Sequence, residues 1–252
     1  MRRQLLSNII ILSFIATVVL LSGCSSSKNI EVKDSSSLHV SRKEFLENLQ
    51  SSISQKSDTV ESYYAKKISV ASDGIPMYNS LNATLYFTDA KLVSKFYLPF
   101  PVVEVAKVRF EEGIFSLYSK PLNKNISKAL PAELLTVFKS AFIGVVPPVY
   151  KYLGDSDFSK FRIYVELDRF VMQRSNGSYN VKISVNADYT LHSIDIDNGV
   201  MELSFESSEY GMESGINVPH FITLRSNAQN NDLKADLTIK SIKLNSSTQL
   251  QY

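Results

Sequence analysis

Cysteine is almost absent from this chain: its 252 residues include a single one, Cys24. One cysteine excludes intramolecular disulfides and metal sites built from several thiolates. Tryptophan is missing, and histidine occurs only at His39, His192 and His220. His39 precedes the first predicted element and the other two lie in separate predicted strands. Neither a zinc site nor a histidine-based catalytic triad is therefore indicated.

Glycine and net charge are also scarce. The chain has nine glycines and no glycine-rich phosphate-binding loop. The 27 Lys and Arg residues nearly balance the 25 Asp and Glu residues and are scattered along the chain. The sequence therefore lacks the clustered positive charge that is typical of a nucleic-acid-binding protein. The carboxylate pairs Glu111-Glu112 and Asp195/Asp197 stand beside glycine-containing turns, where solvated turn residues are the ordinary explanation. We therefore expect no enzymatic activity, no metal, no cofactor and no nucleic-acid partner.

What is present begins with the features of a lipoprotein signal peptide. Arg2 and Arg3 precede an apolar core, which ends in Leu-Ser-Gly-Cys at Cys24. This core is shorter than the about 20 residues that span a bilayer, so cleavage is favoured over a permanent membrane helix. An ordinary secretory signal is the alternative, but the single cysteine occupies the position that lipidation requires. The sequence predicts a signal peptide over residues 1–23 and a stable membrane-lipid anchor on Cys24.

A polar segment separates this anchor from the folded part. Residues 24–39 are serine-rich, carry too little apolar surface to fold alone and are predicted to form a flexible tether. The acidic run associated with surface export of Bacteroidetes lipoproteins is missing after Cys24. We therefore expect a position facing the periplasm. The hydrophobic content of 44% supports a core, and we expect a single domain over residues 40–252.

Two segments have the pattern of helices. Ser41 and Glu44 have capping-box spacing, Val40 and Phe45 occupy the staple positions, and the apolar stripe that follows predicts an amphipathic helix of about four turns. Its members are Phe45, Leu46, Leu49 and Ile53. Residues 131–142 predict a second helix with proline in its first turn. This helix is expected to be largely buried, because most of its circumference is apolar: Leu134, Leu135, Val137, Phe138, Ala141 and Phe142.

The remaining chain alternates apolar and polar residues with the period of two that is typical of strands. Such runs cover residues 83–87, 161–167, 179–185, 201–205, 222–224 and 233–239, and turns are expected at 89–90 and 176–177. Each run has one apolar face, as in an antiparallel sheet that is covered on one side. The predicted class is mainly β (α+β): a curved antiparallel sheet that curls around two or three helices on its concave face.

In this order of elements the chain resembles the lipoprotein-localisation proteins LolA and LolB, and more closely a group of Bacteroidetes lipoproteins with the same fold. The resemblance covers residues 40–252. It is carried by the lipobox at Cys24, the first helix, and the segments 91–120 (KLVSKFYLPFPVVEVAKVRFEEGIFSLYSK), 142–148 (FIGVVPP) and 218–224 (VPHFITL). It implies an incomplete β-barrel whose helices plug the concave face.

The resemblance also implies a function and its residues. A hydrophobic cavity would shelter the acyl chains of lipoproteins or other amphiphiles, received from a periplasmic LolA-like carrier by a monomer at the outer membrane. The cavity-lining candidates are Phe45, Leu49, Leu134, Phe138 and Phe142. A loop that delivers cargo into the membrane corresponds to residues 73–80 (DGIPMYNS), with Ile75 and Met77 as its apolar contacts.

Several of these residues fit more than one structure. Ile75 and Met77 also fit a loop that folds back over the barrel, and Phe100-Pro101-Val102 fits either a membrane-touching tip or a plain turn. The candidate cavity residues fit a filled core equally well, because both environments select the same residue types. A second function is an accessory envelope lipoprotein that binds a protein partner through the outer face of the sheet. That function predicts a filled core and an apolar outer patch.

Overall fold

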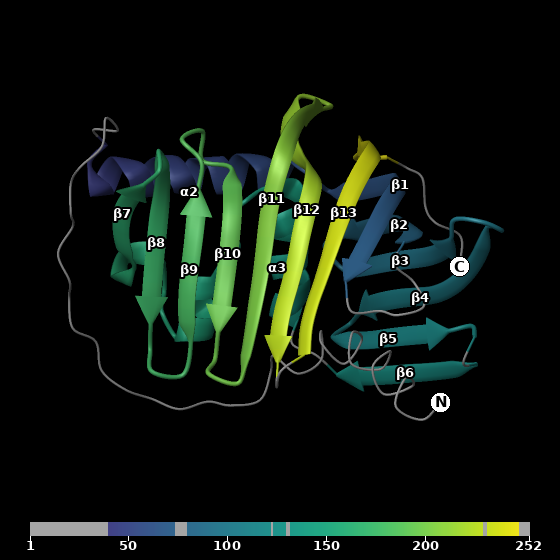
Figure 1. Ribbon diagram of the computed structural model, residues 1–252. Coiled ribbons are helices and arrows are strands. Elements are labelled where there is room, and N and C mark those ends of the chain that lie inside the picture. Colours follow the sequence, from purple (N-terminus) through teal and green to yellow (C-terminus); the bar gives the residue numbers. More distant parts are fainter. Residues whose placement is uncertain (1–39, 74–79, 122, 130–131, 229–230, 247–252) are drawn as a thin grey trace.

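The computed structural model describes residues 40–73, 80–121, 123–129, 132–228 and 231–246. The predicted signal peptide, Cys24, the tether, Ile75 and Met77 lie outside these residues. The described part of the chain forms one antiparallel sheet of thirteen strands (Figure 1). The strands are β1 (Ser62–Asp73), β2 (Ser80–Thr88), β3 (Lys91–Leu98), β4 (Val103–Glu111), β5 (Ile114–Ser119), β6 (Lys124–Ala129), β7 (Arg162–Glu166), β8 (Arg169–Ser175), β9 (Asn180–Val185), β10 (Leu191–Asp197), β11 (Met201–Glu213), β12 (Ile216–Ala228) and β13 (Asn231–Leu244).

Strands that are consecutive in the chain are neighbours in the sheet, except β6 and β7, which form its two opposite edges. The strand order is β6-β5-β4-β3-β2-β1-β13-β12-β11-β10-β9-β8-β7, so β1 pairs with β13 and the sheet is open at its two edge strands. In Figure 1, β7–β13 run up and down the view while β3–β6 run across it. This turn in strand direction is the curl of the sheet, as expected from the right-handed twist accumulated over many strands.

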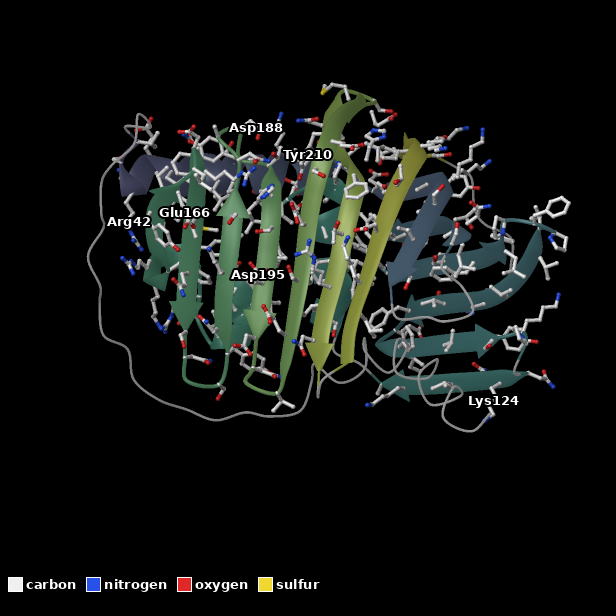
Figure 2. The ribbon with its side chains drawn as sticks, viewed as in Figure 1. Arg42, Lys124, Glu166, Asp188, Asp195 and Tyr210 are labelled. Carbon is white, nitrogen blue, oxygen red and sulfur yellow. The ribbon has the colours of Figure 1, made fainter. Side chains whose placement is uncertain are left out.

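The first helix, α2 (Arg42–Thr59), begins where the capping signal predicts. The Ser41 hydroxyl accepts a hydrogen bond from the backbone amide of Glu44 at 3.2 Å. Arg42 donates from its guanidinium to the carbonyl oxygens of Ser159 and Phe161, at 2.6 and 2.8 Å. These bonds hold the helix start beside β7, as Figure 2 shows for Arg42. With 18 residues, the helix has about five turns rather than the four predicted.

The second helix, α3 (Ala132–Ile143), belongs to the connection between the two edge strands. The chain leaves the sheet after β6, forms α3 and the short 3-10 helices η1 (Val149–Leu153) and η2 (Phe158–Lys160), and re-enters at the opposite edge as β7. Because this connection must cross from one edge to the other, it carries α3 over the concave face, behind β11 and β12 in Figure 1. The helix lies one residue later than predicted.

The apolar interior has two parts. Beside β7–β11, the stripe of α2 packs into a continuous core in which Phe45 and Leu49 are both 1% exposed. Beside β1–β5, β12 and β13, the interior is formed by the inner faces of these strands and by α3. The predicted class is confirmed: a mainly β, curved antiparallel sheet whose concave face is covered by helices.

Candidate functional site

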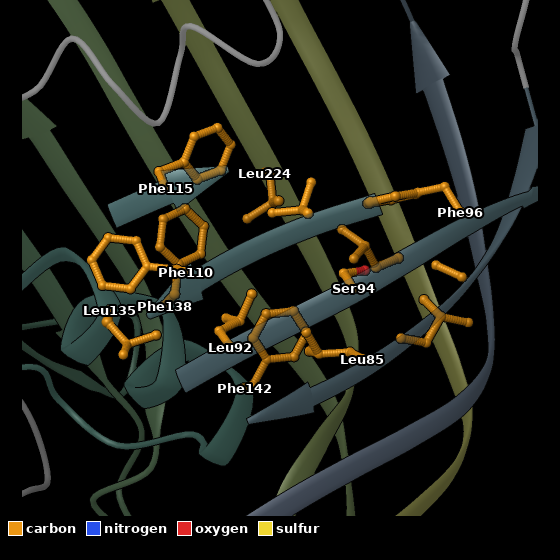
Figure 3. Close-up of a pocket in the computed structure, with 14 residues that line it drawn as sticks. Leu85, Leu92, Ser94, Phe96, Phe110, Phe115, Leu135, Phe138, Phe142 and Leu224 are labelled. Carbon is orange, nitrogen blue, oxygen red and sulfur yellow. The ribbon is translucent and has the colours of Figure 1, made fainter. Parts of the chain in front are cut away.

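An apolar cavity of about 150 Å³ lies between α3 and the curled half of the sheet (Figure 3). Its wall consists of apolar side chains and one serine, contributed by α3 and by seven strands. The lining residues are Ile68, Ala83, Leu85, Leu92, Ser94, Phe96, Val108, Phe110, Phe115, Leu135, Phe138, Phe142, Leu224 and Leu237.

Strand register brings the sheet side of this wall together. Ser94 lies opposite Leu85 across the β2–β3 ladder, and Phe110 lies opposite both Leu92 and Phe115. Directly opposed residues in antiparallel strands point to the same face, so the inner positions of β2–β5 form one continuous apolar surface. The Ser94 hydroxyl donates to the carbonyl oxygen of Thr84 at 3.0 Å. The single polar group of the wall is therefore already hydrogen-bonded.

Helix α3 closes the cavity on the other side through Leu135, Phe138 and Phe142. Phe142 also packs against the stacked rings of Tyr63 and Phe87, with centroid distances of 5.9 and 6.3 Å. Phe138 is only half-buried, and so are Leu92 and Phe96 opposite it. Side chains that keep accessible surface in this way are those expected at the wall of a space rather than in a filled core.

The C-terminal end of α3 is fixed by hydrogen bonds to the sheet and its connections. The Gly144 carbonyl accepts a hydrogen bond from the Leu191 amide at 3.0 Å, and the Ser207 hydroxyl donates to the Ala141 carbonyl at 3.4 Å. Gly144 has a φ of +69°, and a Cβ there would come within 2.5 Å of the Tyr210 ring. A side chain at this position is therefore excluded both by backbone conformation and by space.

A charged side chain of α3, Lys139, lies near the cavity and is largely buried. The Lys139 ammonium lies 3.4 Å from the Asp89 carboxylate and 6.0 Å from the centre of the Phe87 ring. Burial lowers the pKa of Lys139, and Asp89 partly opposes this shift. Burial and the Glu213 carboxylate raise the pKa of Tyr63, whose hydroxyl has no hydrogen-bond partner among the described residues. Tyr63 therefore stays neutral.

The volume of the cavity sets what it can hold. An apolar space of about 150 Å³ is large enough for a molecule of benzene size. The space therefore accommodates roughly six carbon atoms, which is part of one acyl chain. Burial of about 0.8 kcal/mol per CH₂ makes such a segment worth about 5 kcal/mol.

The structure separates the five residues predicted to line a cavity. Phe138 and Phe142 lie in the wall, whereas Phe45 and Leu49 pack in the filled core beside β7–β11. Leu134 belongs to α3, but its side chain lies outside the described part of the structure. No sheet residue of the wall was among the predicted site residues, although the alternation in residues 83–87 places Ala83 and Leu85 on the apolar face of their strand.

The turn between β3 and β4 is the most exposed apolar feature of the described residues. Phe100 is 92% exposed and Val102 is 73% exposed. The turn therefore projects two large apolar side chains into solvent, and it belongs to the same half of the sheet as the cavity.

The other polar clusters have structural partners. Asp155 is buried and accepts hydrogen bonds from Lys160 at 2.7 Å and Arg174 at 3.0 Å. Burial alone raises the pKa of Asp155, but these two cations outweigh it and hold that pKa below its usual range. His192 and His220 pair with separate glutamates at 4.0 and 3.3 Å.

Two features are absent from the described residues. No group of three or more His, Cys, Asp or Glu side chains is placed to hold a metal ion. None of the helices there is both long and apolar enough to cross a membrane.

No protein-family model matches the sequence, and no curated protein matches it. Among solved structures, the chain is similar to a DUF1329 family protein from Desulfovibrio piger, with a TM-score of 0.51 and 11% identity over 81% of this chain and 94% of that chain. It is also similar to a LolA superfamily protein from Nitrosomonas europaea, with a TM-score of 0.47 and 8% identity over 79% and 94% of the two chains. A third is an outer membrane lipoprotein-sorting protein domain from Vibrio parahaemolyticus, with a TM-score of 0.49 and 10% identity over 81% and 95%. The similarity to the Desulfovibrio piger protein establishes a shared fold and nothing about the ligand.

Proposed function

We propose that this chain is a lipid-handling lipoprotein of the bacterial envelope. It is anchored in the outer membrane through lipid on Cys24 and faces the periplasm. It binds the acyl chains of lipoproteins, or of similar amphiphiles, in the apolar cavity and helps to place them in the membrane. A periplasmic LolA-like carrier is the proposed donor, and the protein acts as a monomer.

The apolar cavity is the observation that carries this proposal. A multiply acylated protein cannot cross water with its tails exposed, because each exposed CH₂ costs about 0.8 kcal/mol. An apolar wall whose one polar group is already hydrogen-bonded suits an acyl chain. It provides no free hydrogen-bonding group for a polar ligand. The lipobox and the sequence resemblance to LolA and LolB support the same class of ligand.

Room for a whole tail requires movement of α3. The cavity accommodates roughly six carbons, so a longer chain must displace part of its wall. The start of α3 carries Leu135, while its end is held by the bonds at Ala141 and Gly144. We propose that α3 moves outward to make this room while its end stays fixed at Gly144.

Delivery requires contact with the membrane. Ile75 and Met77 remain the proposed contacts of the loop between β1 and β2. Phe100 and Val102 are proposed to act beside them, because the turns after β1 and β3 lie at the same end of their antiparallel strands. Exposed apolar side chains at such an end gain free energy by entering the lipid interface.

Native mass spectrometry with lipid extraction tests the proposal. The chain from residue 24 onward, with Cys24→Ala, is purified from the periplasm so that its own lipid is absent. Co-purifying acyl chains or a lipopeptide, reduced by Ile75→Glu or Met77→Glu, are expected. A protein that is empty and also fails to take up a fluorescent lipopeptide would rule out the lipid-handling role.

The alternative function, docking of a protein partner on the outer sheet face, is less well supported. It predicts an apolar patch there, but the strongly exposed apolar residues stand mainly at separate turns, such as Phe100, Leu167 and Val200. It also predicts an interior that is filled throughout, whereas an apolar cavity lies between α3 and the curled half of the sheet.

A further inference from the structure

The edge strand β6 places two lysines on the concave side of the sheet. Lys128 lies directly opposite Phe115 and Lys124 opposite Ser119, with Ile126 and Leu117 paired between them. Opposed residues in an antiparallel ladder share a face, so both lysines stand on the face that carries the cavity wall. Because Phe115 lines the cavity, Lys128 lies at its rim. Figure 2 shows Lys124 at the outer edge of the sheet.

Among the described side chains, these two cations have no opposing charge on their side of β2–β5. Both lysines are exposed, and no ion pair joins either of them to an acidic residue within the described ranges. The inward-facing positions of β2–β5 hold apolar residues and serines in the part of the chain that the structure describes, and none of them is acidic. A ligand in the cavity therefore meets positive charge as it leaves the apolar wall, and no carboxylate among the described inward-facing positions of β2–β5 compensates it.

We propose that the ligand is an acyl chain with an anionic headgroup, either a carboxylate or a phosphate. The tail lies in the cavity, and the headgroup binds Lys128, with Lys124 as a second contact. This inference rests on the proposed lipid-binding function and specifies its ligand. A neutral headgroup gains nothing from the two lysines, whereas an anionic one forms charge-assisted hydrogen bonds with their ammonium groups.

Lysines on an edge strand have another established use, which is to prevent pairing with a second chain. That role depends on neither the presence nor the charge of a ligand. A comparison of charged and neutral ligands with the same tail therefore separates the two roles.

Binding is measured by isothermal titration calorimetry on the chain from residue 24 onward, carrying Cys24→Ala. The ligands are palmitate, hexadecanol and lysophosphatidylglycerol with one palmitoyl chain, each kept below its micelle concentration. We expect Lys128→Gln to weaken palmitate binding about tenfold, as loss of a charge-assisted hydrogen bond does, and to leave hexadecanol unchanged. The double variant K124Q/K128Q should weaken it further, and the difference between the ligands should shrink at high salt.

Lys240→Gln is the matched control, because Lys240 is an exposed lysine on β13 and alternates with the buried Leu237 and Ile239. It should change no affinity. If K124Q/K128Q weakens the binding of lysophosphatidylglycerol and palmitate equally, the lysines recognise negative charge in general. If it weakens the binding of only one of these two ligands, that ligand identifies the headgroup as a phosphate or a carboxylate.

Two results overturn the inference. If K124Q/K128Q leaves the affinities for palmitate and lysophosphatidylglycerol both unchanged, or weakens these two anionic ligands and hexadecanol equally, headgroup recognition by these lysines is wrong while lipid binding stands. If the unsubstituted chain binds none of the three ligands, the proposed function fails together with it.

Discussion

Replacement of Ala83 by leucine should block the cavity without unfolding the protein. Ala83 is 3% exposed, lies on β2 and forms part of the wall. Leucine adds three carbon atoms, and the cavity has room for roughly six. The new side chain should therefore occupy about half of the space that an acyl chain would use.

The expected magnitudes follow from the free energy of burying each carbon. Three buried carbons at about 0.8 kcal/mol stabilise the folded state by up to roughly 2 kcal/mol, less any strain. The same three carbons are lost to the ligand, so acyl-chain affinity should fall about fiftyfold. The substitution should thus leave the free energy of unfolding unchanged or raised, while it greatly weakens binding.

Ala65→Leu is the control. Ala65 is 0% exposed, lies on β1 and faces the same interior, but it is not part of the cavity wall. Overpacking a filled site costs about 1–3 kcal/mol. Urea unfolding followed by circular dichroism gives both stabilities, and titration with a fluorescent fatty acid gives affinity. Equal destabilisation by the two substitutions would mean that no usable space exists beside Ala83, and the reasoning would be refuted.

Three further predictions concern stability and membrane contact. Asp155→Asn should lower the free energy of unfolding at pH 7 by about 2 kcal/mol, through loss of charge-assisted bonds to its two cationic partners. Because the pKa of Asp155 is lowered in the folded state, this contribution to stability is complete above about pH 4 and is lost as the pH falls through the folded-state pKa. Urea unfolding in acid should therefore show little difference in stability between the variant and the wild type. Gly144→Ala should destabilise the protein by more than about 2 kcal/mol, because strain at positive φ adds to the clash with Tyr210. Gly177→Ala is the control and should cost only about 1 kcal/mol, because the space around Gly177 is open. Equal melting temperatures of the two variants would contradict this account. Phe100→Ser should change stability by less than about 0.5 kcal/mol, since the side chain is exposed, yet reduce co-sedimentation with lipid vesicles; unchanged vesicle binding would remove the turn from the delivery surface.

Periodicity and capping were sufficient to predict much of the architecture. The helix start at Ser41, the position of α3 and the run that became β2 all depend on side-chain spacing and on hydrogen bonds close in sequence. Such signals act within one turn or one strand, so they survive without knowledge of distant neighbours. The length of α2 was underestimated because its last turns are polar and carry little apolar periodicity.

The sequence by itself determined the fold class, since periodicity depends on residues near one another in the chain. The lipidation signal at Cys24 is a prediction of the same local kind. Only the tertiary structure decided which apolar residues enclose a space. Phe45 and Phe138 look alike in the sequence, but Phe45 packs with the rest of α2 in the core beside β7–β11, whereas Phe138 lines the cavity between α3 and the other half of the sheet. The same holds for Lys128, whose place at the rim follows from its register opposite Phe115. Register and curvature are set by contacts far apart in the chain, and no local pattern records them.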